Sequence, residues 1–231
     1  MMLTYEETSA LILSIQVAVA SVLLSVVPAI GCAWLLARGR FVGRSVVDAV
    51  LHLPLVLPPV AVGYTLLLLL GRRSLVGGWL HERLGLDLAF TWKAAAIAAA
   101  VMGFPLMLRS VRLAMELVDE RTEQAARTLG AGPLRVFLTI TLPLSLPGLL
   151  TGIVLAFARS LGEFGATITF AGNIEGVTRT LPAAIYTFSQ MPGGEGPALR
   201  LMMISAGLSL AALLVSQFLS KRVAALTGNA A

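Results

Sequence analysis

The feature of this sequence that most constrains the fold is a series of apolar runs, each long enough to cross a membrane. Of the 231 residues, 57% are hydrophobic and 13% are charged, whereas about 25% of the residues of a soluble domain are charged. A helix of about 20 apolar residues spans the hydrocarbon core of a bilayer. The runs lack the alternation of a barrel strand, and open sheets cannot face lipid. The sequence therefore predicts an all-α polytopic membrane protein.

We predict five main spans, which cover residues 9–37, 45–70, 89–108, a stretch that begins near residue 145, and residues 198–219. Pro54, Pro58 and Pro59 interrupt the second span, because proline lacks the backbone donor that a helix interior needs. The apolar pieces between residues 162 and 197 are too short to span. Such pieces survive at membrane depth only when protein buries them or they line a cavity. We expect short helical or re-entrant segments there on the outer side, or a sixth span if one of them crosses.

The basic residues indicate an orientation in the membrane. Ten of the 17 Lys and Arg residues fall in the loops after the first, third and fifth spans, and six fall in the other loops. Because cytoplasmic loops are enriched in Lys and Arg, we predict that the N-terminus lies outside and the C-terminus in the cytoplasm. The first ten residues carry two acids and no basic residue. We therefore expect the first span to stay in place rather than to be cleaved as a signal.

Several function classes lack the residues that they need. Cys32 is the only cysteine, and His52 and His81 lie far apart, so the sequence offers no disulfide framework and no metal-ligand set. An intramembrane enzyme needs a catalytic set such as HExxH or a Ser–Lys or Ser–His constellation, and the spans contain none. The basic residues are scattered at the ends of apolar runs, which does not favour a nucleic-acid surface. We therefore expect no catalytic residue, no metal and no nucleic-acid partner.

A polar insert separates the third and fourth spans, and residues 123–143 of it read EQAARTLGAGPLRVFLTITLP. Residues 119–129 have acids first and arginines later, as the helix dipole favours. Gly130 supplies the left-handed residue that ends a helix. Pro133 suits the first position of a second helix. Pro143 and Pro147 would end this second helix and separate it from the fourth span. The insert is therefore predicted to form two short helices joined at Gly-Ala-Gly on the cytoplasmic face.

The spacing within the insert resembles the EAA motif of ABC-importer permeases, which reads EAA, three residues, Gly, nine residues and Ile-x-Leu-Pro. A solvated loop would explain the polarity of the insert but not this spacing. The first position departs from the motif, because Gln124 stands where the family has Glu and the acid lies one place earlier, at Glu123. The positions that match are Gln124, Ala125, Ala126, Gly130, Ile140, Leu142 and Pro143.

The resemblance implies that the first short helix sits in a groove of a cytoplasmic ATPase subunit and transmits ATP-driven closure to the spans. Ala125 and Ala126 are small enough for close approach, and Arg127 and Arg135 would pair with acids. The chain has no GxxxxGK[ST] phosphate loop, so the separate subunit would hold ATP and Mg²⁺, and this chain would need no cofactor.

The family arrangement also implies the surroundings of the chain. These are a homodimer of the permease, two ABC ATPase subunits, an extracytoplasmic oxyanion-binding protein and the lipid of the bacterial cytoplasmic (inner) membrane. The implied fold is a type I ABC-importer permease fold with five or six transmembrane helices. It would form a single transmembrane domain over residues 1–231, with a cytoplasmic coupling loop at residues 109–144.

A second resemblance concerns the substrate. Residues 158–173 read ARSLGEFGATITFAGN and are similar to the segment after the coupling loop in molybdate, tungstate and sulfate permeases. The proline-rich residues 53–67 and residues 178–186 resemble the same proteins, and the compact length favours the molybdate branch. The resemblance implies import of molybdate by alternating access, with tungstate or sulfate and thiosulfate as alternatives. A secondary transporter that uses no ATP is an alternative of another class, but the broken second span has no counterpart half.

Arg159 and Glu163 lie four residues apart on one predicted helix face inside the membrane, where ionisable residues are costly and mark functional sites. Either Arg159 adds positive potential to an oxyanion path, or the two side chains pair and hold spans together. Asp48 and His52 have the same spacing, and for them we expect a structural pair. Neutral donors for an anion near the outer gate would come from Thr and Asn, although such residues also pack spans together. The candidate path residues are Arg159, Glu163, Thr167, Thr169 and Asn173.

Overall fold

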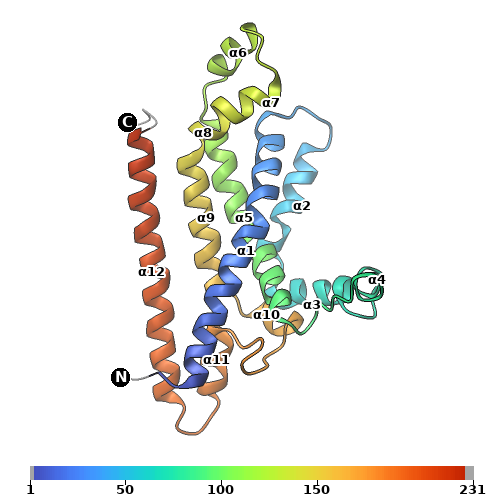
Figure 1. Cartoon of the computed structure of the whole chain (residues 1–231), viewed down its shortest axis with the longest axis vertical. Coiled ribbons are helices and arrows are strands. Elements are labelled where there is room, and N and C mark those ends of the chain that lie inside the picture. The colour runs from blue at the N-terminus through green and yellow to red at the C-terminus, as the bar shows by residue number, and fades with distance from the viewer. Residues whose placement is uncertain (1–2, 227–231) are drawn as a thin grey trace.

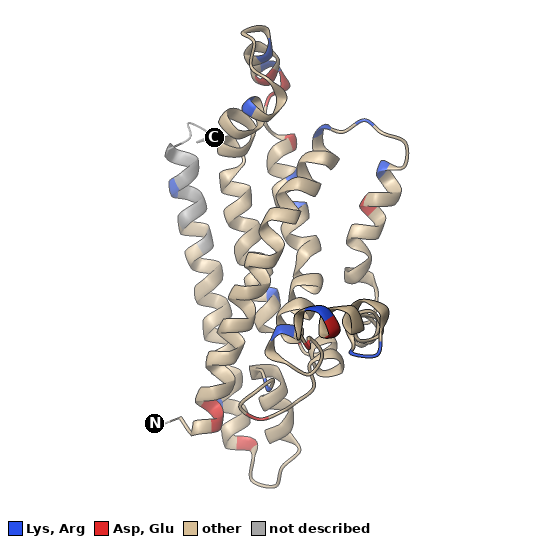
Figure 2. Ribbon diagram, turned by 45° about the vertical axis from the view of Figure 1, so that its right-hand side comes forward, with Lys and Arg blue, Asp and Glu red and all other residues tan. Residues whose placement is uncertain are grey.

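The computed structural model describes residues 3–226, and helices are the only regular secondary structure in that range. Most of them run along one axis and form an elongated bundle (Figure 1). Most charged residues lie toward the two ends of the bundle or on short connecting segments (Figure 2). Among the described residues, three helices are long and apolar enough to cross a membrane, or up to five if each of two bent pairs is one span. This agrees with the prediction of five main spans.

Helix α1, Tyr5–Arg38, lies at the centre of the bundle and starts with a capping box. The Glu7 backbone N–H donates to Thr4 Oγ1 at 3.3 Å, and the Thr4 N–H donates to Glu7 Oε2 at 2.7 Å. Two of the free donors at the helix start are thereby satisfied. The helix continues to Arg38, so its last turn carries a basic side chain out of the apolar part of the bundle.

Helices α5, Trp92–Glu116, and α9, Leu146–Leu161, pack against α1 and complete the core. Small side chains of α5 allow this close packing, and Ala94, Ala95, Ala98 and Ala99 are all fully buried. Helix α5 is longer than the span predicted to end at residue 108. Its added turns include Arg112 and Glu116, whose side chains pair four residues apart and support the helix.

The second predicted span is broken, as expected, into α2, Arg44–Val56, and α3, Pro59–Leu70. The chain bends by 112° between these two helices. The break falls at Leu57 and Pro58, because a residue before proline avoids helical geometry. The prediction that Pro54 interrupts the span is wrong, because α2 continues through this residue. Helix α3 leads sideways to α4, Leu75–Leu84, and the two form an arm beside the bundle (Figure 1).

The segment between α5 and α9 contains α6, Glu120–Thr128, and α7, Pro133–Val136, which correspond to the two predicted short helices. The second of these passes into a π-helical segment, η1, Phe137–Thr141, and then into α8, Leu142–Leu144. The chain bends by 68° at Ser145, between the two prolines predicted to separate the helix from the fourth span.

The short helices expected between residues 162 and 197 are α10, Gly165–Phe170, which packs beside α3, and α11, Leu181–Ser189, which lies at the end of the bundle where α1 starts (Figure 1). Helix α12, Glu195–Leu226, then runs back along the bundle. At this end Arg200 of α12 donates to Oε1 of the buried Glu7 at 2.7 Å. The first and last helices are therefore joined by an ion pair.

Candidate functional site

Helix α6 protrudes from the end of the bundle opposite the N-terminus (Figure 1). It starts at Asp119, whose side chain accepts a hydrogen bond from the Arg121 backbone N–H at 2.9 Å, an N-terminal cap of the usual kind. It ends before Gly130, which has a φ of 87° and so takes the left-handed conformation predicted for it. The sequence thus defines both ends of α6, and the helix is held as a discrete unit.

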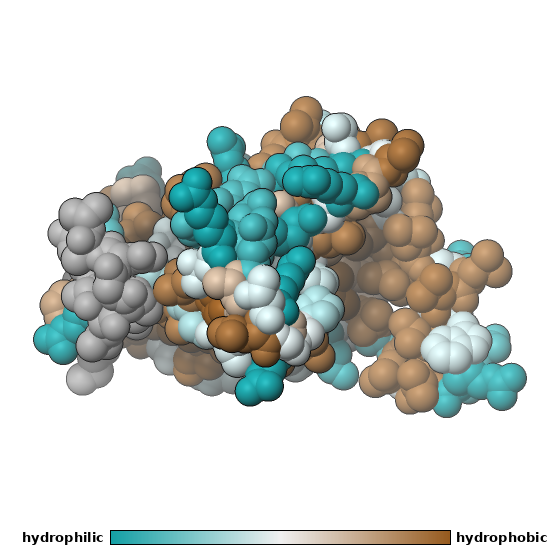
Figure 3. All heavy atoms as spheres, turned by 90° about the horizontal axis from the view of Figure 1, so that it is seen from above, coloured by the Kyte–Doolittle hydropathy of each residue, from teal (hydrophilic) through white to brown (hydrophobic). Residues whose placement is uncertain are grey.

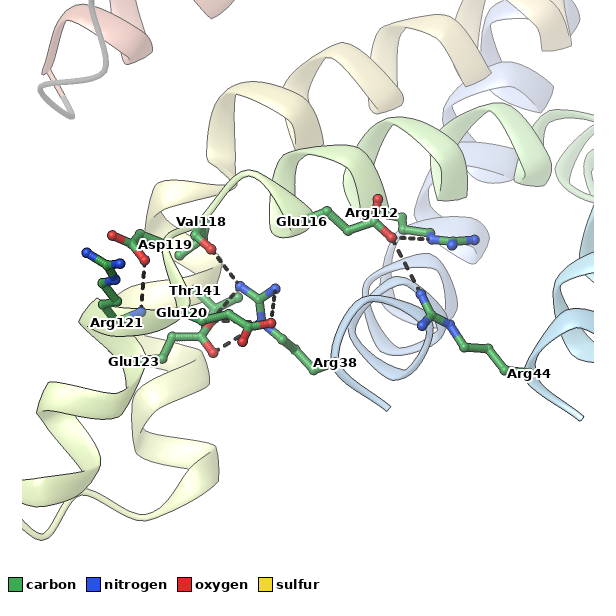
Figure 4. Close-up of polar contacts among 10 residues, drawn as sticks. All are labelled: Arg38, Arg44, Arg112, Glu116, Val118, Asp119, Glu120, Arg121, Glu123 and Thr141. Carbon is green, nitrogen blue, oxygen red and sulfur yellow. Dashed lines mark hydrogen bonds and ion pairs between the residues drawn. The ribbon is translucent and has the colours of Figure 1, made fainter. Parts of the chain in front are cut away.

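Glu123 fixes α6 to the bundle, and the acid lies at this position rather than at Gln124. Its carboxylate accepts hydrogen bonds from Arg38 Nε at 3.1 Å, from Arg38 Nη2 at 3.0 Å and from Thr141 Oγ1 at 2.8 Å (Figure 4). Arg38 Nη2 also donates to the Val118 carbonyl oxygen at 2.9 Å. The Glu123 side chain is only 5% exposed, and that of Arg38 is 14% exposed. Charge-assisted bonds of this forked kind are among the strongest in proteins.

The other motif residues of α6 face outward. Gln124 and Ala125 are exposed, and Ala126 is half-buried. Leu129 at the end of the helix is 88% exposed and Leu134 is 67% exposed. Figure 3 looks onto this end of the molecule and shows hydrophilic residues gathered over its middle, with hydrophobic residues prominent beside them. The end of α6 therefore presents an apolar tip within a polar surface.

The second half of the motif lies where the π-helical segment leads into the bundle. Thr141 is buried, whereas Ile140, Leu142 and Pro143 are half-buried. The extra residue in a π turn rotates the residues after it, and such segments occur often at functional sites. Here the turn directs Thr141 toward Glu123. The two halves of the motif, which are separated by 18 residues in the chain, are thus in direct contact.

The acids around α6 are engaged within the chain. Glu116 accepts from Arg112 Nε at 2.8 Å, and its Oε1 lies 3.7 Å from Arg44 Nη2 (Figure 4). Glu120 lies 3.9 Å from Arg38. In contrast, three arginines of α6 and α7 have no ion pair within residues 3–226, which leaves positive charge on the outward surface. These are Arg121, Arg127 and Arg135.

Arg159 and Glu163 come together as the spacing predicted. Arg159 Nη1 lies 2.6 Å from Glu163 Oε2. Glu163 is almost fully buried, and its Oε1 accepts a hydrogen bond from the Ala166 N–H at the start of α10. The Arg159 side chain is 29% exposed. The pairing interpretation fits these contacts, and the Arg159 side chain is only partly enclosed.

The remaining candidate path residues make local hydrogen bonds. Thr167 is buried and donates to the Phe164 carbonyl oxygen, and Thr169 donates to that of Gly165. Asn173 bridges the loop that comes next, since it donates to Thr187 Oγ1 at 2.9 Å and accepts from Arg179 Nε at 3.1 Å. The structure therefore places these residues in one region after Glu163, with their hydroxyl and amide groups occupied.

Two sets of polar contacts were missed by sequence reasoning, one wholly and one in part. One is the Arg38 and Thr141 pair that holds Glu123. In the sequence Arg38 serves only as one of the basic residues that indicate orientation in the membrane. Because it lies 85 residues before Glu123, no local pattern predicts their contact. The other lies between α2 and α5, where Asp48 contacts both Arg112 at 2.9 Å and His52 at 3.2 Å. The expected Asp48–His52 pair is present, and Arg112 makes it part of a larger network around a cavity of about 370 Å³.

The sequence matches the family described as "Binding-protein-dependent transport system inner membrane component" over residues 29–225. It is 58% identical over 221 residues to "Molybdenum transport system permease protein ModB" of Escherichia coli (strain K12), an alignment that covers 96% of each chain. The protein of the same name from Haemophilus influenzae is 55% identical over 94% of this chain and 95% of its own. "Sulfate transport system permease protein CysW" of Synechocystis sp. is 36% identical over 93% of this chain and 77% of its own.

Two solved structures have a similar fold. A chain of the structure titled "Inward facing conformations of the MetNI methionine ABC transporter" superposes with a TM-score of 0.68 at 14% identity, over 96% of this chain and 99% of its own. A chain of "Crystal structure of an amino acid ABC transporter with histidines" superposes with a TM-score of 0.64 at 16% identity, over 96% of this chain and 100% of its own. At these identities the likeness is one of fold.

Proposed function

Because this chain belongs to the family of binding-protein-dependent transport system inner membrane components, we propose that it is the permease subunit of an ATP-driven importer for molybdate. The family match covers residues 29–225, which include all helices from the last turns of α1 into α12. The predicted type I ABC-importer permease fold is confirmed by the all-helical bundle and by its likeness to the two transporter chains. The chain is thus a component of a transport system of the inner membrane.

One observation carries the choice of molybdate. The identity to relatives named as molybdenum permeases is 58% and 55% over nearly the whole of both chains, whereas the relative named as a sulfate permease is 36% identical. The favoured substrate is therefore molybdate. Tungstate and sulfate are similar tetrahedral dianions, and competition between the three oxyanions in an uptake assay separates them.

The surface of α6 supports a role as the coupling helix, with residues 109–144 as the coupling loop of a single transmembrane domain. The helix protrudes from the bundle, has defined ends and presents Ala125 and the exposed Leu129 at its outward face. The arginines without ion pairs add positive charge around it. A groove on an ATPase subunit with acidic side chains at its rim would match both features.

The finer arrangement follows from this function. ATP and Mg²⁺ are held by two separate ATPase subunits, and this chain contributes no catalytic residue and no cofactor. Two copies of the chain form the permease, and an extracytoplasmic protein delivers the oxyanion. The N-terminus lies outside, and the α6 end lies in the cytoplasm. Arg159, half-buried beside Glu163, contributes positive potential to the path, with Thr167, Thr169 and Asn173 near the outer gate.

Substrate choice is tested by uptake into proteoliposomes that contain the permease and its ATPase subunit, supplied with the oxyanion-binding protein. We expect ATP-dependent uptake of labelled molybdate that excess unlabelled molybdate suppresses and excess sulfate does not. Suppression by sulfate at equal concentration would assign the transporter to sulfate, and selective suppression by tungstate would assign it to tungstate. Uptake without ATP would contradict the ABC mechanism.

The coupling role is tested by capture of the ATPase subunit with Ala125→Glu and Gly130→Val permeases. A charged side chain at Ala125 fills the contact face, and valine at Gly130 cannot adopt a φ of 87° without strain. We expect both variants to lose the ATPase subunit and ATP-dependent uptake while they remain in the membrane. Ala125→Ser is the matched control and should retain both. If the two variants transport normally, α6 is not the coupling helix.

A further inference from the structure

We propose that Arg38 and Glu123 form a positioning clamp that makes the first span, α1, move with α6 when the ATPase subunits close. The proposal rests on the coupling role of α6 and adds to it a second route for the motion. We define the clamp as the side chains of Arg38, Glu123 and Thr141 together with the backbone carbonyl of Val118. Figure 4 shows the Arg38 guanidinium, which comes from the end of α1, enclosed by groups from the loop.

The hydrogen bonds of the clamp fix the orientation of α1 relative to α6 as well as the distance between them. The Arg38 guanidinium uses Nε and Nη2 on the carboxylate and Nη2 again on the Val118 carbonyl. Thr141 occupies a further lone pair of Glu123 Oε1. A planar fork on a carboxylate fixes orientation as well as distance, which a lysine ammonium would not do. With both side chains largely buried, rotation of α6 relative to α1 would leave a desolvated charge unpaired, which is strongly unfavourable.

The path of the chain shows why such a clamp matters. Helix α6 is joined covalently to α5 through the short stretch after Glu116, and to α9 through α7, η1 and α8. Helix α1 has no chain connection to this loop, because α2, α3 and α4 lie between it and α5. The clamp supplies the missing connection, so all three core helices converge on α6. A tilted ring contact between Trp34 of α1 and Phe137 of η1, with ring centroids 5.3 Å apart, reinforces it.

The clamp also differs from the ionic contacts that join α2 to α5. Arg44 of α2 reaches Glu116 at 3.7 Å, with side chains 39% and 37% exposed. Exposed pairs of this kind contribute little. The first span is therefore held to the loop by a buried fork, whereas α2 is held to α5 by the solvated Arg44–Glu116 pair and by the partly exposed pair of Asp48 with Arg112 at 2.9 Å. We infer that α1, α5 and α9 follow α6 as one body, and that α2 is attached to this body through α5 rather than through the clamp.

The proposal is tested with Arg38→Lys, Glu123→Gln and the exchanged pair Arg38→Glu with Glu123→Arg, each reconstituted with the ATPase subunit and the oxyanion-binding protein. Three quantities are measured: retention of the ATPase subunit, ATP hydrolysis with and without loaded binding protein, and molybdate taken up per ATP hydrolysed. We expect the single variants to keep the ATPase subunit and their basal hydrolysis. Their uptake per ATP should fall about tenfold, because a single misplaced contact remote from the chemistry costs rates on that order or more.

The exchanged pair should recover part of the uptake per ATP, since it restores an ion pair at the same place. Arg40→Ala is the matched control, an exposed arginine two residues beyond Arg38 with no ion pair among the described residues, and should behave as wild type. If the single variants keep the wild-type ratio of uptake to hydrolysis, or if they lose the ATPase subunit together with all activity, the clamp is not a positioning device. A wild-type permease that fails to bind the ATPase subunit would instead overturn the proposed function.

Discussion

At the scale of single residues, the closest approaches between helices depend on glycine. Gly63 of α3 lies against α10, and a Cβ at this position would be 2.5 Å from the Ala166 carbonyl oxygen and 2.8 Å from its Cα. These are backbone atoms, which cannot turn aside as a long side chain can. The arm formed by α3 and α4 is therefore attached to the bundle through a contact that tolerates no side chain.

Gly63→Ala is expected to destabilise the protein, by at least the roughly 1–3 kcal/mol typical of an overpacked core. The measurement is thermal unfolding in detergent, in which the variant should melt at a lower temperature than wild type. Gly31→Ala is the control, because no atom lies within 4 Å of a Cβ built there. Equal melting temperatures for the Gly63 variant and wild type would show that α3 and α10 do not pack as described.

Arg159→Ala is expected to lower stability by about 3–5 kcal/mol, because it leaves the buried carboxylate of Glu163 without its cation. In the double variant Arg159→Met with Glu163→Gln, the charge is gone and an oxygen remains to accept from the Ala166 N–H. This variant should recover most of the lost stability in the same melting assay. Uptake by the stable double variant then measures the path role: it should stay well below wild type, and wild-type uptake would leave the pair with a structural role alone.

The sequence could identify most motif residues but not their contacts. Glu123 and Gln124 are adjacent, and only the structure shows that Glu123 points inward to Arg38 while Gln124 faces outward. The inward position of Glu123 depends on its contact with Arg38, which lies 85 residues earlier in the chain. The Arg159–Glu163 pair was predictable, in contrast, because helical spacing alone brings side chains four residues apart together.

At the scale of elements, the π-helical segment η1 connects α7 to α8, just before the 68° bend that leads into α9. Its extra residue places Thr141 on the side that faces Glu123, and Leu138 of this segment is 52% exposed. Apolar periodicity could not have predicted this turn, because a π segment has the composition of an ordinary helix. Helix α4 was also missed, although Ser74 and Gly85 mark its ends as cap and left-handed stop.

Deletion of Leu138 is expected to turn η1 into an ordinary helical turn and so to remove the local widening that directs Thr141 toward Glu123. Thr141 and Glu123 would then no longer meet. We expect the deleted permease to reach the membrane but to lose ATP-dependent uptake, measured in proteoliposomes. Leu138→Ala, which removes the side chain and keeps the residue count, should retain uptake. Normal uptake after the deletion would show that the π turn has no role in coupling.

At the scale of the whole molecule, the predicted number and order of the main helices agree with the structure, since long apolar runs leave few alternatives. The positions of helix ends differ from the predictions where polar residues continue a helix beyond the apolar run, as in the last turns of α5. The arm of α3 and α4 could not be anticipated, because the 112° bend depends on local backbone geometry at two residues.

The predicted orientation is tested with single cysteines in a Cys32→Ser background. Val42 lies in the loop after α1 and is 104% exposed, and Leu75 starts α4 and is 95% exposed. A maleimide that cannot cross the inner membrane, added to cells with a permeable outer envelope, should label Leu75→Cys and not Val42→Cys. Both should be labelled once the membrane is opened. The reverse pattern would invert the topology.

The ion pair between Glu7 and Arg200 has a consequence for how the protein is made. The two partners are 193 residues apart, so the carboxylate of Glu7 is synthesised long before its guanidinium partner. Until α12 is inserted, the first turn of α1 holds an acid whose final burial is not yet compensated by a cation. A chain that stalls before α12 therefore carries at its first helix a carboxylate that lacks its guanidinium partner. Completion of the last helix therefore supplies the cation that compensates the burial of Glu7.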